Sequence, residues 1–443
     1  MGSIWAFVLL WGVWLITPVL VDGVDTVGRL LVVRSHQRDK MEREEFEDDE
    51  LPTVTVIVPA HNEAAVIDRC LNSVKAQDYP HDKLEIIVID DGSTDGTAVR
   101  VEGHVNGDTT YSDSFVLRGQ PIKVGPFKGT LELIKNGHQG KAHALNAGIA
   151  ASSGEIVVNI DSDVVISPTC VRAIASSFQR NPEMGAATGN IEIDWELIET
   201  RDRDGNLVLD EDGRIVSKRL GPVENFLARS QFLEYLASFD LGRRSQAQTE
   251  TMYTLAGACS AFRRSVLEAG TFYSNTTVSE DTAVTFDLHK QNVTIGFVED
   301  ARVYLEPVID WDGLYAQRVR WTRGQLEVCG LNEDLIGKRK LGSFSSVAVP
   351  KMLLFDHTLA FPRLIWAPLI LAFPLIGYSW TVIILAILAM YVFYLAMEVV
   401  NTLAVFSIAD DHTRDRIEHA AWVVFGMPLY RSSCSTSGSP DSS

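Results

Sequence analysis

The sequence predicts an α/β domain with a mostly parallel central sheet, held between membrane-spanning helices. Apolar, β-branched segments in the first half of the chain end in polar or acidic residues, and segments with helical spacing separate them. Strands that are apolar on both faces and alternate with helices are typical of a parallel sheet covered on both sides. Long uncharged runs lie near both ends of the chain, and a membrane span requires such runs.

The predicted strands are Thr53–Pro59, Lys83–Asp91 and Glu155–Asp163, and the helices between them are Glu63–Gln77 and Lys141–Ser152. Open parallel sheets bind ligands beyond the carboxyl ends of their strands, so the acids at these ends mark the expected site. Two segments interrupt the alternation. We expect residues 102–129 to form a loop and residues 201–220, which contain two Asp-Gly pairs, to form an inserted hairpin.

Membrane spans are predicted at both ends of the chain. Ile4–Val21 is uncharged and lacks the positive n-region and cleavage site of a signal peptide, so we expect an uncleaved anchor. Basic residues follow this run and none precedes it, which places the next segment in the cytoplasm. Leu364–Tyr378 and Thr381–Met397 predict a helical hairpin. A third apolar run, Ala420–Tyr430, stops before a Ser-rich tail, which is either a flexible terminus or the sign of a membrane helix cut off partway.

These predictions divide the chain into six parts. They are an N-terminal transmembrane helix (1–22), a charged cytoplasmic linker (23–51), the α/β domain (52–332), an interfacial segment (333–360), a transmembrane hairpin (361–405) and a cytoplasmic C-terminal stretch (406–443). The net charge of −19 argues against a nucleic-acid partner, because phosphate backbones are bound by surplus Lys and Arg. The five cysteines have no CxxC spacing, so we expect reduced thiols and no structural zinc.

The acidic strand ends are the first candidate site. Asp161 and Asp163 lie one residue apart at the end of a strand, where two carboxylates can share Mg²⁺ or Mn²⁺ bridged to a diphosphate. An ordinary acidic turn is the alternative, because an isolated D-x-D motif is common. Asp91 ends another strand, where helix capping by Ser93 or Asp95 and ligand binding can coexist.

The remaining candidate site residues lie at the starts of two predicted helices and on one face of a third. Lys141 lies in the first turn of a helix, where backbone N–H groups already favour an anion. Asp281 precedes a helix with apolar periodicity, so it is either part of an N-cap or a general base. Gln317, Arg320 and Trp321 share one face of a helix, for which binding to the membrane surface is the alternative.

In their order along the chain, these motifs resemble the family 2 glycosyltransferases. The series is Pro59-Ala60-His61-Asn62-Glu63, Asp90-Asp91-Gly92-Ser93, Gly140-Lys141, Asp161-Ser162-Asp163, Glu280-Asp281 and Gln317-x-x-Arg320-Trp321. It is most similar to the membrane-embedded branch of the family, which contains the synthases of cellulose, chitin, hyaluronan and poly-N-acetylglucosamine. The resemblance covers Val54 to Gly330 and implies a GT-A fold and a reaction that inverts configuration at the anomeric carbon.

The resemblance also implies which residues bind the donor. Asp91 would contact the nucleotide, with Asn62 and Glu63 near it. Asp161 would approach the diphosphate, and Lys141 would add positive charge there. A diphosphate leaving group requires this charge neutralisation in a water-poor cleft.

The resemblance also implies which residues bind the metal, act as the catalytic base, hold the pyrophosphate and support the acceptor. By the same resemblance, Asp163 would be the ligand of Mg²⁺ or Mn²⁺. Asp281 matches the catalytic base that takes the proton from the acceptor hydroxyl. Gln317 and Arg320 match the groups that hold the pyrophosphate, and Trp321 matches the platform under the acceptor sugar.

The implied reaction transfers a sugar from a nucleotide sugar, which we expect to be a UDP-sugar, to a growing polysaccharide at the cytoplasmic membrane face. Three predicted spans are fewer than polymer-exporting members usually have. Three alternatives therefore stay open: several copies form the export channel, a partner protein supplies it, or the enzyme transfers a single sugar to a lipid-linked acceptor. A nucleotide-sugar pyrophosphorylase would need a Gly-rich loop near the start of the domain and no membrane hairpin. An inactive scaffold would lack a motif acid or the Trp, and none is missing.

Overall fold

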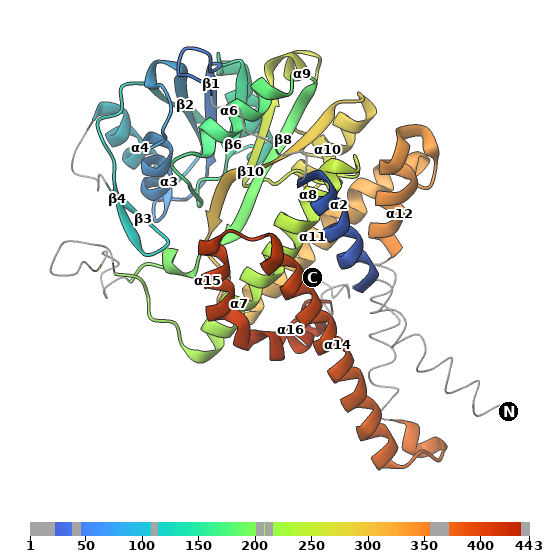
Figure 1. The fold of residues 1–443 in the computed structure, drawn as a ribbon. Coiled ribbons are helices and arrows are strands. Elements are labelled where there is room, and N and C mark those ends of the chain that lie inside the picture. The colour runs from blue at the N-terminus through green and yellow to red at the C-terminus, as the bar shows by residue number, and fades with distance from the viewer. Residues whose placement is uncertain are drawn as a thin grey trace.

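The computed structural model describes residues 23–37, 46–107, 114–200, 208, 216–354 and 372–435. Its strands are β1 (Val54–Ala60), β2 (Leu84–Asp91), β3 (Ser114–Leu117), β4 (Gln120–Lys123), β5 (Thr130–Asn136), β6 (Ile156–Ile160), β7 (Val165–Ile166), β8 (Met184–Ile193), β9 (Cys259–Arg263) and β10 (Thr294–Leu305). Within these residues, the central sheet has eight strands in the order β5-β2-β1-β6-β9-β8-β10-β7 (Figure 1). Strands β5, β2, β1 and β6 run parallel, whereas β9 and β7 are antiparallel to their neighbours. The predicted mostly parallel α/β sheet is confirmed.

The helices of the described residues lie before, between and after these strands. They are α2 (Val24–Gln37), α3 (Ile67–Lys75), α4 (Thr97–Asn106), α5 (Lys141–Ala151), α6 (Cys170–Arg180), α7 (Pro222–Tyr235), α8 (Arg243–Gln248), α9 (Arg264–Glu268), α10 (Glu280–Lys290), α11 (Trp311–Leu331), α12 (Val349–Met352), α14 (Trp380–Ile408), α15 (Asp411–Ala420) and α16 (Met427–Ser435). A π-helical segment, Leu236–Gly242, joins α7 to α8. Helices α3 and α6 pack on one face of the sheet and α5 on the other (Figure 1).

Strand β1 is the centre of the core, and all seven of its residues are buried. Val56 and Val58 belong to the cluster with α3 and α6, whereas Ile57 belongs to the cluster with α5. This alternation follows from the two-residue period of a strand. Helix α5 approaches β1 closely because Gly148 faces Ile57, where a Cβ atom would collide with the Ile57 side chain.

The structure corrects two predicted segments. Residues 102–129 are not simply a loop, because they contain the end of α4 and a separate antiparallel hairpin of β3 and β4. Helix α3 begins at Ile67 and not at Glu63. Much of the predicted hairpin at 201–220 lies outside the described residues, but an antiparallel bridge joins Glu199 to Ser217 at its base.

One helix among the described residues, α14, is long and apolar enough to cross a membrane. It has 29 residues, and its most apolar stretch has a mean hydropathy of 2.4. It extends well beyond the predicted span Thr381–Met397 at its C-terminal end. The predicted N-terminal anchor Ile4–Val21 and most of the first hairpin segment, Leu364–Tyr378, lie outside the described residues.

The C-terminal elements fold back onto the α/β domain. Helix α15 is joined to the sheet by ion pairs of Arg416 with Asp194, at 2.8 Å, and of Arg302 with Asp410. The apolar run Ala420–Tyr430 forms a short 3₁₀ helix and the start of α16, and it packs beside α7, α11 and α14. Among the described residues this run is therefore not one continuous α-helix.

Candidate active site

The end of β6 and the start of α5 bring the first charged groups together. Lys141 begins α5 directly after Gly140, which has a φ of 96° that favours glycine. Its Nζ lies 2.6 Å from Asp161 Oδ1 and 3.3 Å from Glu280 Oε1. The predicted link between Lys141 and the D-x-D motif is present, and Glu280 is an additional partner that sequence reasoning did not identify.

Gly257 lies at the centre of the charged cluster, on the turn just before β9. A methyl group on its Cα would lie 3.4 Å from Lys141 Nζ, 3.5 Å from Asp281 Oδ2 and 3.9 Å from Asp161 Oδ2. One small space is therefore bounded by an ammonium and two carboxylates. The turn lies in the segment Leu255–Ser260, which leads into β9.

Helix α11 packs beside α10 and borders the same cavity. Gly324 faces Ser279, and a Cβ atom at this position would overlap the Ser279 side chain. Because Ser279 precedes α10, this close approach places the predicted face of α11 next to Asp281. The side chain of Asp281 accepts a hydrogen bond from the Thr282 backbone N–H, at 2.7 Å, and does not cap the helix in the usual N-cap geometry.

Burial and like charges raise the pKa values of the carboxyl groups. Burial, followed by the charge of Glu280, raises the pKa of Asp281. Burial, with a contribution from Asp163, raises the pKa of Asp161 to about 6 although Lys141 opposes the shift. Burial would lower the pKa of Lys141, but Asp161 and Glu280 outweigh it and raise that pKa. Raised carboxyl pKa values in a cleft are typical of groups that exchange protons or bind cations.

The turn after β1 is tied to the turn after β2. Asn62 has a φ of 59°, its backbone N–H donates to Ser93 Oγ at 2.9 Å, and its Oδ1 accepts from the Thr94 N–H at 2.8 Å. The Glu63 N–H donates to Thr97 Oγ1 at 2.8 Å. Burial, and then the charge of Asp163, raises the pKa of Glu63 to about 7.

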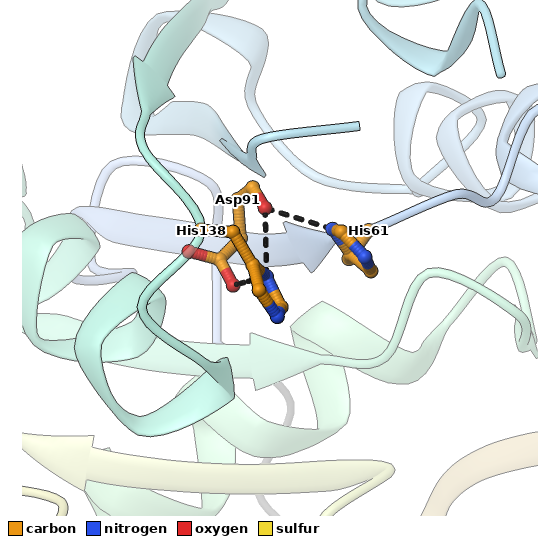
Figure 2. A group of neighbouring side chains, drawn as sticks. All are labelled: His61, Asp91 and His138. Carbon is orange, nitrogen blue, oxygen red and sulfur yellow. Dashed lines mark hydrogen bonds and ion pairs between the residues drawn. The ribbon is translucent and has the colours of Figure 1, made fainter. Parts of the chain in front are cut away.

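Asp91 holds the loop that precedes α5. Its carboxylate accepts hydrogen bonds from the backbone N–H groups of Gln139 and Gly140, each at 2.9 Å, and it contacts His138 Nδ1 at 2.9 Å. His61 Nδ1 contacts the Asp91 carbonyl oxygen at 2.8 Å, and the two imidazoles stack with centroids 4.2 Å apart (Figure 2). One ligating atom from each of the three residues lies within 4.8 Å of the others, so this group could hold a metal ion.

A cavity of about 1550 Å³ extends from these groups to helix α14. The predicted site residues that line it are Lys141, Asp161, Asp163, Asp281, Gln317, Arg320 and Trp321. Tyr391, Tyr394, Glu398 and Asn401 line it from one face of α14. The other predicted residues, Asn62, Glu63 and Asp91, are not among its lining residues and surround the ends of β1 and β2.

Trp321 lies in an aromatic cluster within this cavity. Its ring centroid is 6.4 Å from those of Tyr235 and Phe239, and the Arg318 guanidinium lies 4.5 Å from it. Arg243 lines the cavity with its guanidinium 4.6 Å from the Phe239 ring, and burial lowers the pKa of Arg243 to about 10. Sequence reasoning missed Tyr235, Phe239 and Arg243, because nothing in their spacing distinguishes them from core residues.

Comparison with known proteins assigns the family. The profile of Glycosyl transferase family 2 matches residues 55–271, and that of Glycosyl transferase family group 2 matches residues 213–415. The chain is a family 2 glycosyltransferase. The two matches contain all the predicted site residues, and the resemblance inferred from motif order is confirmed.

This glycosyltransferase is similar to curated bacterial proteins. It is 28% identical over 302 residues to the poly-beta-1,6-N-acetyl-D-glucosamine synthase of Staphylococcus epidermidis, a match that covers 68% of this chain and 58% of the relative. It is 27% identical over 281 residues to the synthase of the same name from Staphylococcus aureus strain COL, covering 63% and 56%. The chain thus spans a little over half the length of these relatives.

The GT-A fold is shared with a solved glycosyltransferase. The mannosyltransferase PcManGT from Pyrobaculum calidifontis, solved in complex with GDP-Man and Mn²⁺, superposes with a TM-score of 0.58 at 19% identity. The match covers 93% of this chain and 98% of that one. At this identity the comparison establishes the fold alone.

Proposed function

We propose that this enzyme transfers a sugar from a nucleotide-sugar donor to the growing end of a polysaccharide, with inversion, at the cytoplasmic face of a membrane. The arrangement around Gly257 supports the proposal, because the carboxylate of Asp281, which we propose as the base, borders the same small space as the Lys141–Asp161 pair. The names of the bacterial relatives favour N-acetylglucosamine as the transferred sugar, with UDP-N-acetylglucosamine as the donor.

The donor diphosphate is proposed to lie between β6 and α11. Lys141 and Arg320 both line the cavity and would supply positive charge to it. Asp163, with Asp161, has the oxygen ligands that Mg²⁺ or Mn²⁺ prefers, and the ion pair of Asp161 with Lys141 is consistent with a cation at this position. The metal would neutralise charge on the departing nucleoside diphosphate. Gln317 Oε1 is buried without a hydrogen-bond donor among the described residues, so it can accept one from the substrate.

The base and the acceptor platform are proposed to face the anomeric carbon from the other side. Asp281 takes the proton from the acceptor hydroxyl, and its raised pKa makes it a stronger base than an exposed aspartate. The nucleophilic oxygen then attacks the anomeric carbon as the nucleoside diphosphate leaves. Trp321 supports the acceptor sugar, whose C–H groups pack on the indole.

The continuation of the cavity favours a polymeric acceptor. Beyond the catalytic groups, the cavity follows a face of α14 that carries two tyrosines, a glutamate and an asparagine. Aromatic and hydrogen-bonding side chains suit an oligosaccharide better than an alkyl chain. Transfer of one sugar to a lipid-linked acceptor is the competing outcome of the test.

The test measures nucleotide release by detergent-solubilised protein from a panel of UDP- and GDP-sugars, with Mg²⁺, Mn²⁺ or EDTA. We expect metal-dependent release from UDP-N-acetylglucosamine, absent in Asp281→Asn, and a product ladder on a gel. A single discrete lipid-bound product would contradict polymer synthesis. Release that persists in Asp281→Asn would contradict the role of the base.

A further inference from the structure

We infer that Glu234 and Tyr430 are positioning residues for the acceptor platform Trp321, acting through Arg318. The inference rests on the proposed function, since it assumes that Trp321 supports an acceptor sugar. It makes the C-terminal helix α16, which lies outside every motif of the catalytic domain, a part of acceptor binding.

A series of side-chain contacts connects α16 to the cavity. The Tyr430 hydroxyl donates to Glu234 Oε2 at 2.6 Å, and Arg318 Nη2 donates to the same oxygen at 2.6 Å. The Arg318 guanidinium lies 4.5 Å from the centre of the Trp321 ring. Three helices, α7, α11 and α16, therefore meet at one carboxylate oxygen.

The residues that make these contacts are largely buried, which restricts their conformations. Tyr430 is 0% exposed, and the side chains of Arg318 and Glu234 are 11% and 17% exposed. Hydrogen bonds to charged groups in such surroundings are short and directional. Because the guanidinium is planar, the carboxylate that fixes its nitrogen also fixes its plane. Glu234 thus sets the orientation of the group stacked on Trp321.

The same geometry determines how the platform is used. Arg318 and Trp321 are three residues apart on α11 and so lie on neighbouring positions of one helix face. Arg318 occupies one face of the indole, and Tyr235 and Phe239 approach it with ring tilts of 48° and 70°. We propose that the acceptor sugar packs on the face opposite Arg318. An Arg318 side chain released from Glu234 could rotate across the cavity and obstruct that face.

A purely structural role for Tyr430 makes a different prediction. If the role were purely structural, removing the Tyr430 hydroxyl would lower the stability of the fold and reduce every activity in proportion. If Tyr430 positions the platform, the same change raises the KM for the acceptor more than it alters the rate of nucleotide release without acceptor. The discriminating measurement is therefore the ratio of these two effects.

The experiment uses the full chain in detergent with UDP-N-acetylglucosamine and an N-acetylglucosamine oligosaccharide as acceptor. The variants are Tyr430→Phe, which removes one hydroxyl, and Glu234→Gln, which removes the charge. The matched control is Tyr79→Phe, because Tyr79 is also buried and its hydroxyl bonds a backbone carbonyl, of Pro52, far from α11. We expect the acceptor KM to rise about 5-fold in Tyr430→Phe and about 20-fold in Glu234→Gln, and to stay within about 2-fold in the control.

A double-mutant cycle shows whether Glu234 acts through the platform. In a Trp321→Ala background, Glu234→Gln should raise the acceptor KM by less than about 2-fold, because coupled residues are non-additive. Additive effects would overturn the inference, as would wild-type acceptor KM values in both single variants.

The outcomes separate this inference from the proposed function. A wild-type enzyme that extends the oligosaccharide, with variants that behave like it, overturns only the inference. If the wild type releases nucleotide but extends no oligosaccharide, calorimetric titration of the same oligosaccharide replaces the kinetic readout, and weaker binding by Glu234→Gln than by wild type still supports the inference. Absence of oligosaccharide binding by the wild type overturns both.

Discussion

Replacing Gly257 with alanine should disable the enzyme without unfolding it. The added methyl would lie 3.4 to 3.9 Å from Lys141, Asp281 and Asp161, distances that are close to ordinary van der Waals contact. Gly257 is not among the residues with positive φ, so alanine can adopt its backbone conformation. We therefore expect the free energy of unfolding to change by less than about 1 kcal/mol.

The effect on turnover should be far larger. The donor oxygen that binds Lys141 and the acceptor hydroxyl that binds Asp281 must each lie within about 3 Å of its partner, and the methyl would crowd the space between these two groups. A displacement of about 1 Å in a reacting group costs on the order of 100-fold in rate, or about 2.7 kcal/mol of transition-state stabilisation. The expected kcat/KM of Gly257→Ala is therefore about 1% of wild type.

The assay compares nucleotide release with the thermal midpoint of unfolding in the same detergent. Gly125→Ala is the matched control, because Gly125 lies in a loop, has no positive φ and has no atom within 4 Å of an added methyl. We expect both variants to unfold within about 2 °C of wild type. Gly257→Ala with at least a third of wild-type activity would refute the arrangement of groups around this glycine.

Four further outcomes are expected. Asp281→Asn should lower transfer by about 10³-fold while calorimetry still detects donor binding; intact transfer would contradict its role as base. Because burial and Glu280 raise the pKa of Asp281, its ionised form is lost as pH falls through a value above the usual ~3.9, so the acid limb of kcat/KM should lie above that pH. Trp321→Ala should impair transfer to the acceptor more than donor hydrolysis, and equal losses would argue against the platform. Arg416→Met should destabilise the fold by about 3 kcal/mol because it strands the buried Asp194 carboxylate, and an unchanged unfolding midpoint would show that the pair is dispensable.

The strands that lead to the candidate site could be predicted, because each is encoded by a short run of neighbouring residues. The β-branched runs at β1, β2 and β6 are buried on both faces, and a parallel sheet places their carboxyl ends at one edge. Asp161 and Lys141 could therefore be placed together before their 2.6 Å contact was seen. The helical period likewise placed Gln317 and Trp321 on the same wall of the cavity.

Features that depend on distant partners could not be predicted. The close approach of α11 requires Gly324, but the reason is visible only when Ser279 is placed against it. The contacts of Glu234 with Arg318 and Tyr430 span 84 and 196 residues. An apolar run such as that around Tyr430 has the same composition whether it faces lipid or packs on protein, so its hydropathy alone could not predict its contacts with α7 and α11.

The ion pairs that join α15 to the sheet have a mechanical consequence. Helix α14 has 29 residues and is about 43 Å long, whereas the hydrocarbon core of a bilayer is about 30 Å thick. Its C-terminal part, from Glu398 onward, lies in contact with the catalytic domain and leads directly into α15. If α14 spans a bilayer, its N-terminal part would lie in lipid while its C-terminal part is held by the catalytic domain. A change in bilayer thickness that tilts the N-terminal part would then also turn the catalytic cavity relative to the membrane plane.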